Sequence, residues 1–228
     1  AMENFTAHDR EQLLIAMNAN MTTDAFNKIV SDWLKTAINP HFKKHYTDLV
    51  YEPMLEVIQY LRKNNFQVYI VSGGGQEFIR TFSPQVYSIE LSHVIGTVGV
   101  TNYKYIDKKP VLMKTEKVLL VSNGPGKVEA INLFIGIKPI IAFGNSDGDK
   151  EMLEWTQSNS YPHAEFLVHH DDAKREFAYD KDTKVGTFST ALMNHAKHNG
   201  WKIISMKNDW QVIFPFQQEQ KKQKALVG

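Results

Sequence analysis

Residues 66–75 read FQVYIVSGGG, and this stretch decides how the rest of the chain is interpreted. The run Phe66–Val71 is rich in aromatic and β-branched residues, which is typical of a largely buried strand. Ser72 and three glycines follow at once, and the residues from Gln76 towards Ser83 fit a short helix. A strand, a small-residue loop large enough for a phosphate group and a helix form a unit of parallel α/β proteins.

The sequence on both sides of this unit alternates between helical and strand patterns. We expect helices over about 8–18, 24–38, 53–64, 125–134, 150–155 and 187–198, strands over 139–143, 166–169 and 202–206, and a small antiparallel ribbon over 94–113. Such alternation predicts an α/β fold, a Rossmann-like parallel sheet covered by helices on both faces. Ligands bind such sheets at the carboxyl ends of the strands.

The composition is that of an ordinary globular protein. The 228 residues include 26 Lys and Arg against 25 Asp and Glu, and 43% are hydrophobic, which excludes disordered and fibrous classes. Lysines and arginines are scattered, so we expect no nucleic-acid partner.

The sequence contains no candidate membrane span and leaves the compartment open. Its most apolar stretch, Ile131–Phe143, is interrupted by Gly136, Lys138 and Pro139 and is shorter than the roughly 20 residues that a span needs. The absence of cysteine excludes disulfides but not an oxidising compartment. The start lacks the features of a signal peptide, and an alanine, Ala1, precedes Met2, so we do not take this start as the natural N-terminus. The localisation therefore stays open between the cytoplasm and a bacterial exported compartment.

Three sets of polar residues fall in loops that this fold would bring to one edge of the sheet. They are Ser72, Lys127 at a helix start, and the group Asn145, Asp147 and Asp149 after a strand. Phosphoryl transfer needs hydroxyl and backbone donors, a cation, and hard oxygen ligands for magnesium. Each set also has an ordinary explanation as a tight turn, a solvated lysine or a helix cap.

Taken together, these segments resemble the haloacid dehalogenase superfamily, specifically its phosphatases with a helical cap. The strings that carry the likeness are VSGGGQEF around Ser72, GPGKVEAI around Lys127, and GNSDGDKEML over 144–153. Further strings place the chain near a bacterial group of phosphoserine-phosphatase-like hydrolases: MTTDAF, YEPMLE, VHHDDAKREFAYD and GWKIISMKNDW. The likeness covers roughly residues 21–216.

The resemblance implies a division of the chain and an activity. The parts would be a partial helical cap over 5–50, an α/β core over 51–216 that includes the ribbon, and a flexible tail over 217–228. The activity would be magnesium-dependent hydrolysis of a small phosphomonoester through an aspartyl-phosphate. Ser72 and the Gly73 backbone would hold phosphate oxygens, and Lys127 would offset their charge.

The resemblance also implies a Mg²⁺ site in the loop after residue 143. Asn145 and Asp149 would be ligands, and Asp147 would be a ligand or would orient one. Asn145 stands where many relatives carry an aspartate, so the site would have one negative charge fewer.

The first motif of the family, a strand followed by Asp-x-Asp-Gly-Thr, is not in this sequence. It supplies the nucleophile and the acid/base group, so we expect the chain by itself to be inactive or nearly so. The string Asp180-Lys181-Asp182-Thr183 lacks the glycine, and we interpret it as a solvated loop. The alternative is a non-enzymatic module that binds phosphate, metal or a partner chain.

The missing motif has a structural consequence, because in the family its strand is the centre of the sheet. Its absence exposes backbone donors and acceptors on two strand edges. We expect another polypeptide, a repurposed segment or a rearranged pairing to fill this gap.

Two further groups of residues are weighed as parts of the site. His169, His170 and Arg175 follow a predicted strand, and the resemblance makes contact with substrate or with the site residues plausible, while helix capping by Asp171 explains the segment equally well. The aromatic residues of the cap and its hinge, where the family places substrate selection, are more simply explained by core packing: Trp33, Tyr46 and Tyr51.

Overall fold

The computed structural model describes residues 15, 18–178, 183 and 186–218. The chain forms two compact units, the first from residues 1–37 and 69–135 and the second from residues 38–68 and 136–228. These units do not follow the expected bounds of cap, core and tail, and that division stays a prediction.

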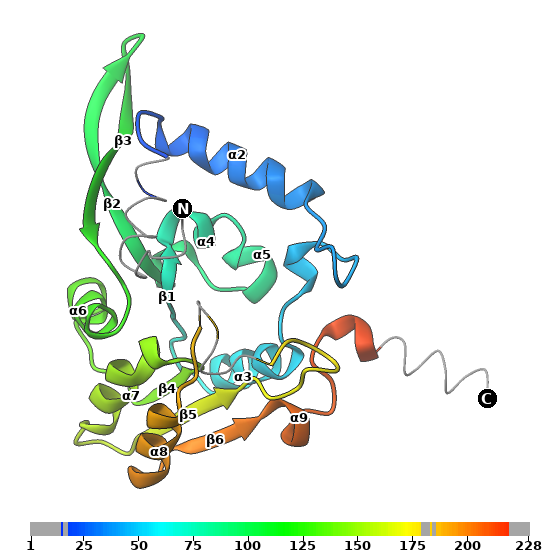
Figure 1. Cartoon of the computed structure of the whole chain (residues 1–228). Coiled ribbons are helices and arrows are strands. Elements are labelled where there is room, and N and C mark those ends of the chain that lie inside the picture. Colours follow the sequence, from blue (N-terminus) through cyan, green and yellow to red (C-terminus); the bar gives the residue numbers. More distant parts are fainter. Residues whose placement is uncertain (1–14, 16–17, 179–182, 184–185, 219–228) are drawn as a thin grey trace. The chain divides into compact units, whose positions relative to one another are not determined.

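The first unit contains a three-stranded mixed sheet in the order β1-β2-β3 (Figure 1). Strand β1 runs parallel to β2, and β2 forms a long antiparallel hairpin with β3. Its elements are α2 (Thr23–Thr36), β1 (Ile70–Gly75), α4 (Gln76–Arg80), α5 (Ser83–Tyr87), η2 (Leu91–His93), β2 (Val94–Ile106), β3 (Lys109–Leu120) and α6 (Pro125–Phe134). The expected helix over 125–134 has the bounds of α6.

Strand β1 begins later than predicted and continues through Ser72 and the three glycines. The expectation of a strand over 66–71 with a loop at Ser72 was therefore wrong in its bounds. The glycines allow unusually close strand contact, since a Cβ on Gly96 in β2 would lie 2.6 Å from the carbonyl oxygen of Gly74. Close backbone approach keeps this small-residue segment in the sheet.

The predicted ribbon is present as the β2–β3 hairpin, with two long strands instead of several short pieces. Its two-residue turn is Asp107-Lys108, with φ angles of 49° and 64°. Positive φ at both positions is the geometry of tight hairpin turns that match the twist of the strands.

The second unit contains a fully parallel sheet in the order β4-β5-β6 (Figure 1). Its elements are η1 (Tyr46–Asp48), α3 (Glu52–Lys63), β4 (Ile141–Gly144), η3 (Asp147–Asp149), α7 (Lys150–Gln157), β5 (Ala164–His169), α8 (Thr190–His198), β6 (Lys202–Ser205) and α9 (Met206–Asp209). The predicted α/β class with parallel strands is confirmed.

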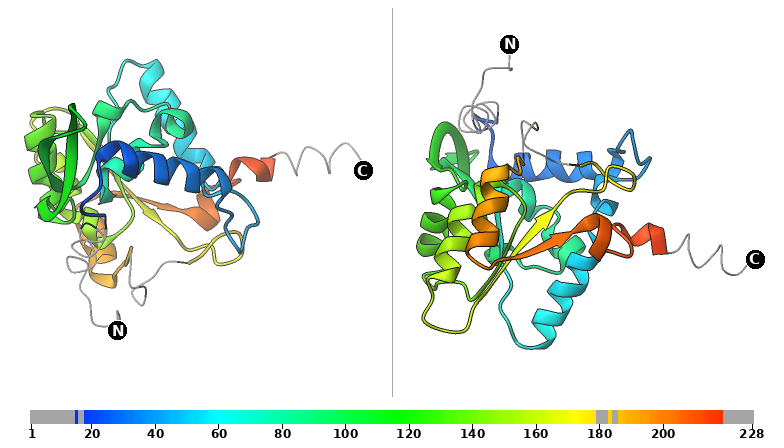
Figure 2. Two further views of the ribbon diagram at one scale, coloured as in Figure 1. Left: turned by 90° about the horizontal axis from the view of Figure 1, so that it is seen from above. Right: turned by 60° about the horizontal axis from the view of Figure 1, so that its bottom comes forward.

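The two faces of the second sheet are covered by different helices (Figure 2). A Cβ on Gly144 would lie 2.5 Å from Cβ of Asp149 and 3.2 Å from Leu153, so this residue faces α7. Phe143 points the other way, because side chains alternate along a strand, and stacks on Phe166 with centroids 4.6 Å apart. On that face a core of Val168, Met206, Trp210, Ile213 and Phe214 packs with residues that include Tyr51 and Met54 at the start of α3.

Strands β1 and β4 are both edge strands in the part of the chain that the structure describes. Whether another segment covers either edge stays a prediction.

Two predicted features lie outside the described residues. They are the helix over 8–18, apart from residues 15 and 18, and the Asp180–Asp182 string. Of the predicted tail, the first two residues are held: Gln217 Oε1 accepts from the backbone of Ile213 at 2.7 Å, and Gln218 donates to Glu52 at 3.2 Å.

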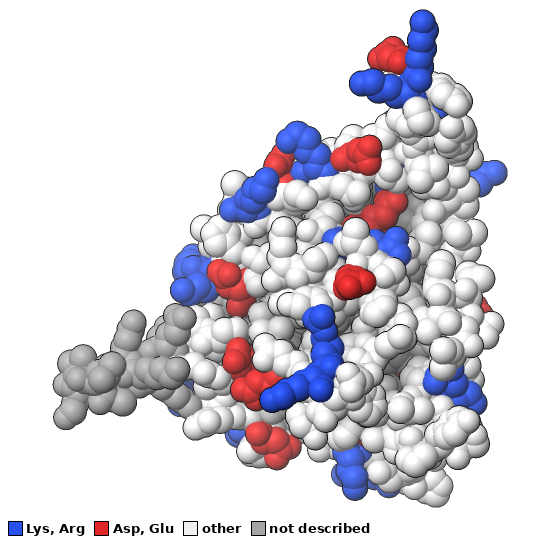
Figure 3. Space-filling model, turned by 180° about the vertical axis from the view of Figure 1, so that it is seen from behind, with Lys and Arg blue, Asp and Glu red and all other residues white. Residues whose placement is uncertain are grey.

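Charges of both signs are interspersed on the face that Figure 3 shows. Among the described residues, no helix is long and apolar enough to cross a bilayer.

Candidate functional site

Lys127 is presented by the first turn of α6 and contacts β1 near the start of the strand, at Val71. Its side chain is buried, and Nζ donates a 2.7 Å hydrogen bond to the carbonyl oxygen of Val71. The turn before α6 needs glycine twice. Gly124 has a φ of 56°, and a Cβ on Gly126 would lie 1.9 Å from the carbonyl oxygen of Val121. The two glycines of the GPGK string therefore allow the tight turn that places Lys127 next to β1.

Thr97 links the predicted phosphate-binding segment to the approach of α6. Its hydroxyl donates to the Gly73 carbonyl oxygen at 2.7 Å and accepts from the Ser122 backbone N–H at 3.2 Å. Beside it, Ser72 Oγ accepts from Gly74 N–H at 3.1 Å. The structure therefore brings Ser72, Gly73 and Lys127 together in the first unit.

Sequence reasoning missed Thr97 and Ser122. Both are buried, and within the described residues Ser122 Oγ has no hydrogen-bond partner. Thr97 lies in the apolar run VIGTVGV, where a threonine looks like any other strand residue. Only the pairing of β1 with β2 reveals its contact with Gly73.

The loop after β4 holds Asn145, Asp147 and Asp149 together in the second unit. The buried Asp149 accepts three hydrogen bonds at Oδ2, from Asn145 N–H (2.9 Å), Ser146 N–H (3.0 Å) and Ser146 Oγ (3.1 Å). Asp147 Oδ1 accepts from the backbone and hydroxyl of Ser189 at 3.2 and 2.8 Å. Both carboxylates therefore shape the loop.

These residues do not form a complete magnesium site. Among the described residues, no group of three or more His, Cys, Asp or Glu side chains is arranged to hold a metal ion. Magnesium prefers six oxygens in near-octahedral geometry, and the loop offers two carboxylates already engaged in hydrogen bonds, with the Asn145 amide. Further oxygen ligands would have to come from elsewhere.

His170 belongs to a buried polar cluster in the second unit. Its Nδ1 lies 3.5 Å from the Tyr51 hydroxyl and 3.6 Å from Glu176 Oε2. Tyr51 also donates to Glu176 Oε1 at 3.4 Å. His169 is separate from this cluster and packs its ring on Phe188 with centroids 4.4 Å apart.

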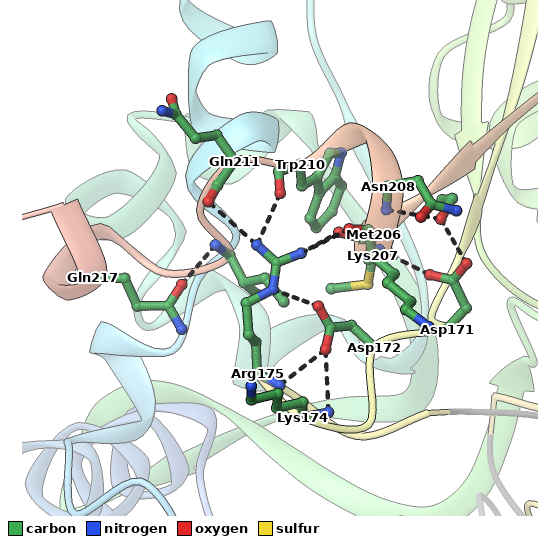
Figure 4. Close-up of polar contacts among 12 residues, drawn as sticks. Asp171, Asp172, Lys174, Arg175, Met206, Lys207, Asn208, Trp210, Gln211 and Gln217 are labelled. Carbon is green, nitrogen blue, oxygen red and sulfur yellow. Dashed lines mark hydrogen bonds and ion pairs between the residues drawn. The ribbon is translucent and has the colours of Figure 1, made fainter. Parts of the chain in front are cut away.

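Arg175 fastens the segment that follows β6 (Figure 4). Its guanidinium pairs with Asp172 and donates to four backbone carbonyl oxygens, those of Met206 (2.7 Å), Trp210 (2.8 Å), Gln211 (3.2 Å) and Lys207 (3.3 Å). Burial alone would raise the pKa of Asp172, but the hydrogen bonds and charge of Arg175 outweigh it and lower this pKa. Through these contacts Arg175 has a structural role, which is to hold the backbone of residues 206–211 next to Asp172.

Asp171 serves the start of α9. It accepts from Lys207 N–H at 2.9 Å and from the hydroxyl of Ser205, the N-cap residue. Burial would raise the pKa of Asp171, but these hydrogen bonds prevail and lower it. Asp171 therefore supports the amino-terminal end of α9 from outside the helix, and contact of this segment with substrate stays a prediction.

The sequence of residues 2–154 matches the family described as HAD, haloacid dehalogenase-like hydrolase. The chain belongs to this family. The matched range includes Ser72, Lys127 and the Asn145–Asp149 loop of this haloacid dehalogenase-like hydrolase, whereas His169, His170 and Arg175 lie beyond it.

Two solved structures are similar to this hydrolase. A conserved functionally unknown protein from Anaerococcus prevotii DSM 20548 is 18% identical with a TM-score of 0.55, over 82% of this chain and 50% of the other. A phosphoserine phosphohydrolase-like protein from Francisella tularensis subsp. tularensis SCHU S4 is 16% identical with a TM-score of 0.40, over 75% and 69% of the two chains. A search of curated proteins found no match.

The likeness to the Anaerococcus protein supports the fold. This chain spans half of that protein's length.

Proposed function

We propose that this chain forms part of a magnesium-dependent phosphohydrolase that cleaves a small phosphomonoester through an aspartyl-phosphate. The observation that carries the proposal is the buried ammonium of Lys127, held 2.7 Å from the carbonyl oxygen of Val71, the residue before Ser72. A buried cation next to a hydroxyl and a run of glycine N–H groups is suited to a phosphoryl group.

Four residues of the first unit have a role in this proposal. The Ser72 hydroxyl and the Gly73 backbone N–H hold oxygens of the phosphoryl group. Lys127 offsets the negative charge that these oxygens carry while the ester bond breaks. Thr97 holds the peptide group that follows Gly73 in its orientation, through the 2.7 Å hydrogen bond to the Gly73 carbonyl oxygen.

The nucleophile and the acid/base group are assigned to a segment outside the printed sequence, which lacks Asp-x-Asp-Gly-Thr. An extended segment bearing two aspartates would pair with an edge strand, β1 or β4. If it pairs with β4, it would also add oxygen ligands to the Asn145–Asp149 loop of the same unit, which is incomplete as a magnesium site. When bound, magnesium would supply positive charge to the phosphoryl group.

The test compares the printed chain with the protein expressed from its complete native reading frame. Intact mass shows whether the native species is heavier, and hydrolysis of 4-nitrophenyl phosphate is measured with magnesium and with EDTA. We expect a heavier, magnesium-dependent enzyme and no turnover by the chain alone. Lys127→Met in the active species should lower kcat by about 10²–10³-fold, the loss typical for one stabilising donor.

A second candidate is a module that binds phosphate without turnover, favoured by the lack of a nucleophile in the sequence. A native mass equal to that of the chain, phosphate binding that depends on Lys127, and no hydrolysis would establish this module and overturn the enzyme.

A further inference from the structure

The second unit contains a cavity of about 380 Å³ on the sheet face opposite α7. Its volume lies within the range of about 300–1,000 Å³ that is typical of small-molecule pockets. The lining residues are Tyr51, Met54, Phe143, Gly144, Asn145, Val168, His170, Gly186 and Trp210.

The cavity lies at the carboxyl ends of β4 and β5, where ligands bind parallel sheets. Phe143 pairs in register with Phe166, so two residues further on Asn145 and Val168 continue the same face of the sheet. Asn145 also begins the loop proposed to hold magnesium. The cavity therefore adjoins the proposed metal loop within the second unit.

Aromatic side chains form a large part of the cavity wall. The ring of Tyr51 lies 5.5 Å from that of Trp210 at 52°, and 5.5 Å from that of His170 at 67°. Phe143 forms another part of the wall, and its position is set by stacking on Phe166. Tilted and edge-on rings of this kind pack favourably around a further planar ring.

A few polar groups interrupt this apolar lining, namely the Asn145 amide, the Tyr51 hydroxyl and the His170 imidazole. Buried contacts hold the last two in place. His170 and Glu176 are both about 5% exposed at their side chains, with Nδ1 3.6 Å from Oε2. No hydrogen bond reaches Glu176 Oε2 within the described residues.

We infer that this cavity binds the alcohol part of the substrate and that this part is a phenol-like aromatic ring with a polar substituent. The inference rests on the proposed function for the phosphate, because the ring would be the leaving group of the phosphomonoester. The rings of Tyr51, Phe143 and Trp210 provide the apolar contact, and the Asn145 amide, the Tyr51 hydroxyl and the His170 imidazole provide hydrogen bonds to the substituent. A small aliphatic alcohol would leave most of the aromatic wall unused.

The test uses phenol, which lacks phosphate, so that ring binding is measured apart from catalysis. The chain has four tryptophans, and Trp210→Phe identifies the Trp210 indole N–H signal in ¹H–¹⁵N NMR spectra. We expect phenol to shift this signal saturably and cyclohexanol to bind at least fivefold more weakly. Absence of a saturable shift would overturn the assignment.

Three variants test whether phenol binds in this cavity and not elsewhere on the chain. Val168→Phe fills the cavity and should weaken phenol binding at least tenfold, whereas Leu133→Phe, at an exposed position, should not change it. Tyr51→Phe keeps the ring, removes the hydroxyl and should weaken binding about threefold. If Val168→Phe does not fold, Met54→Phe serves as the filling variant. Unchanged affinity in the folded filling variant would overturn the proposal.

The two proposals fail separately in this design. Saturable phenol binding without hydrolysis by the native protein would refute the phosphatase and leave a ring-binding cavity. Hydrolysis of 4-nitrophenyl phosphate without a phenol-induced shift would support the phosphatase and refute the ring-binding cavity.

Discussion

Thr97 Oγ1 donates a 2.7 Å hydrogen bond to the carbonyl oxygen of Gly73, across the parallel pairing of β2 with β1. The same oxygen accepts from the backbone N–H of Ser122 at 3.2 Å. Ser122 precedes α6, and Lys127 lies in the first turn of that helix. One buried hydroxyl thus connects the segment proposed to hold phosphate oxygens with the helix that carries the cation.

Thr97→Val should weaken phosphate binding about threefold to tenfold. The substitution preserves shape but leaves the Gly73 carbonyl and the Ser122 N–H without this partner, at a cost of about 1–3 kcal/mol in stability. Inorganic phosphate binding by ³¹P NMR and urea unfolding measure the two effects. Thr97→Ser keeps the hydroxyl and should restore binding; a Ser variant as impaired as Val would argue against the hydrogen bond.

Lys127→Met should abolish phosphate binding with a modest effect on folding. The lost charge-assisted hydrogen bond to Val71 is worth about 1.5–3 kcal/mol, partly offset because a buried charge is removed. Lys127→Arg keeps the charge but not the size, so partial binding is expected. Calorimetric titration with phosphate, alongside thermal unfolding, separates the two effects; full binding by the Met variant would remove Lys127 from the site.

Gly126→Ala should destabilise the first unit by about 2–4 kcal/mol, because its Cβ would lie 1.9 Å from the Val121 carbonyl oxygen and the turn must shift. Gly75→Ala is the matched control, since its Cβ would meet no atom closer than 3.9 Å. Urea unfolding of both variants checks this. Equal stability would show that the turn before α6 is not as tight as described.

Arg175→Met should cost about 3 kcal/mol of unfolding free energy, the lower end of what is expected when one partner of a buried ion pair is removed, because Asp172 is buried but the Arg175 side chain is 28% exposed. The loss also frees four backbone carbonyl oxygens at residues 206–211. Arg175→Lys should recover little, because an ammonium cannot reproduce the fork of guanidinium donors. Chemical denaturation measures both, and a Lys variant as stable as the native chain would contradict this view.

Stability should fall in acid as Asp172 and Asp171 are protonated. The pKa of each is lowered in the folded chain. Their contribution is therefore complete above the unfolded pKa of about 3.9 and is lost as the pH falls through the folded values. Unfolding free energies between pH 7 and pH 2.5 test this. Asp172→Asn should be less stable at pH 7 and should lose less on acidification; an unchanged acid slope would rule out this carboxyl as a cause.

Local sequence signals determined the elements and the polar groups at their ends. The bounds of α6 follow from Pro125 in its first turn and from helical spacing to Phe134, and the apolar runs before His169 and near Lys202 form the parallel strands β5 and β6. Such signals act over a few residues, so they are visible in the chain itself. The family motifs likewise indicated Ser72, Lys127 and the Asn145–Asp149 loop.

The tertiary structure alone decided which groups meet across long sequence separations. The extension of β1 through its glycines depends on the close approach of Gly96, and the contacts of Thr97 with Gly73 and of Tyr51 with His170 depend on which strands and helices pack together. The structural role of Arg175 also depends on packing, because it requires carbonyl oxygens of residues 206–211 to lie around its guanidinium. Packing sets these contacts through the burial of apolar surface over the whole unit, which no short stretch of sequence encodes.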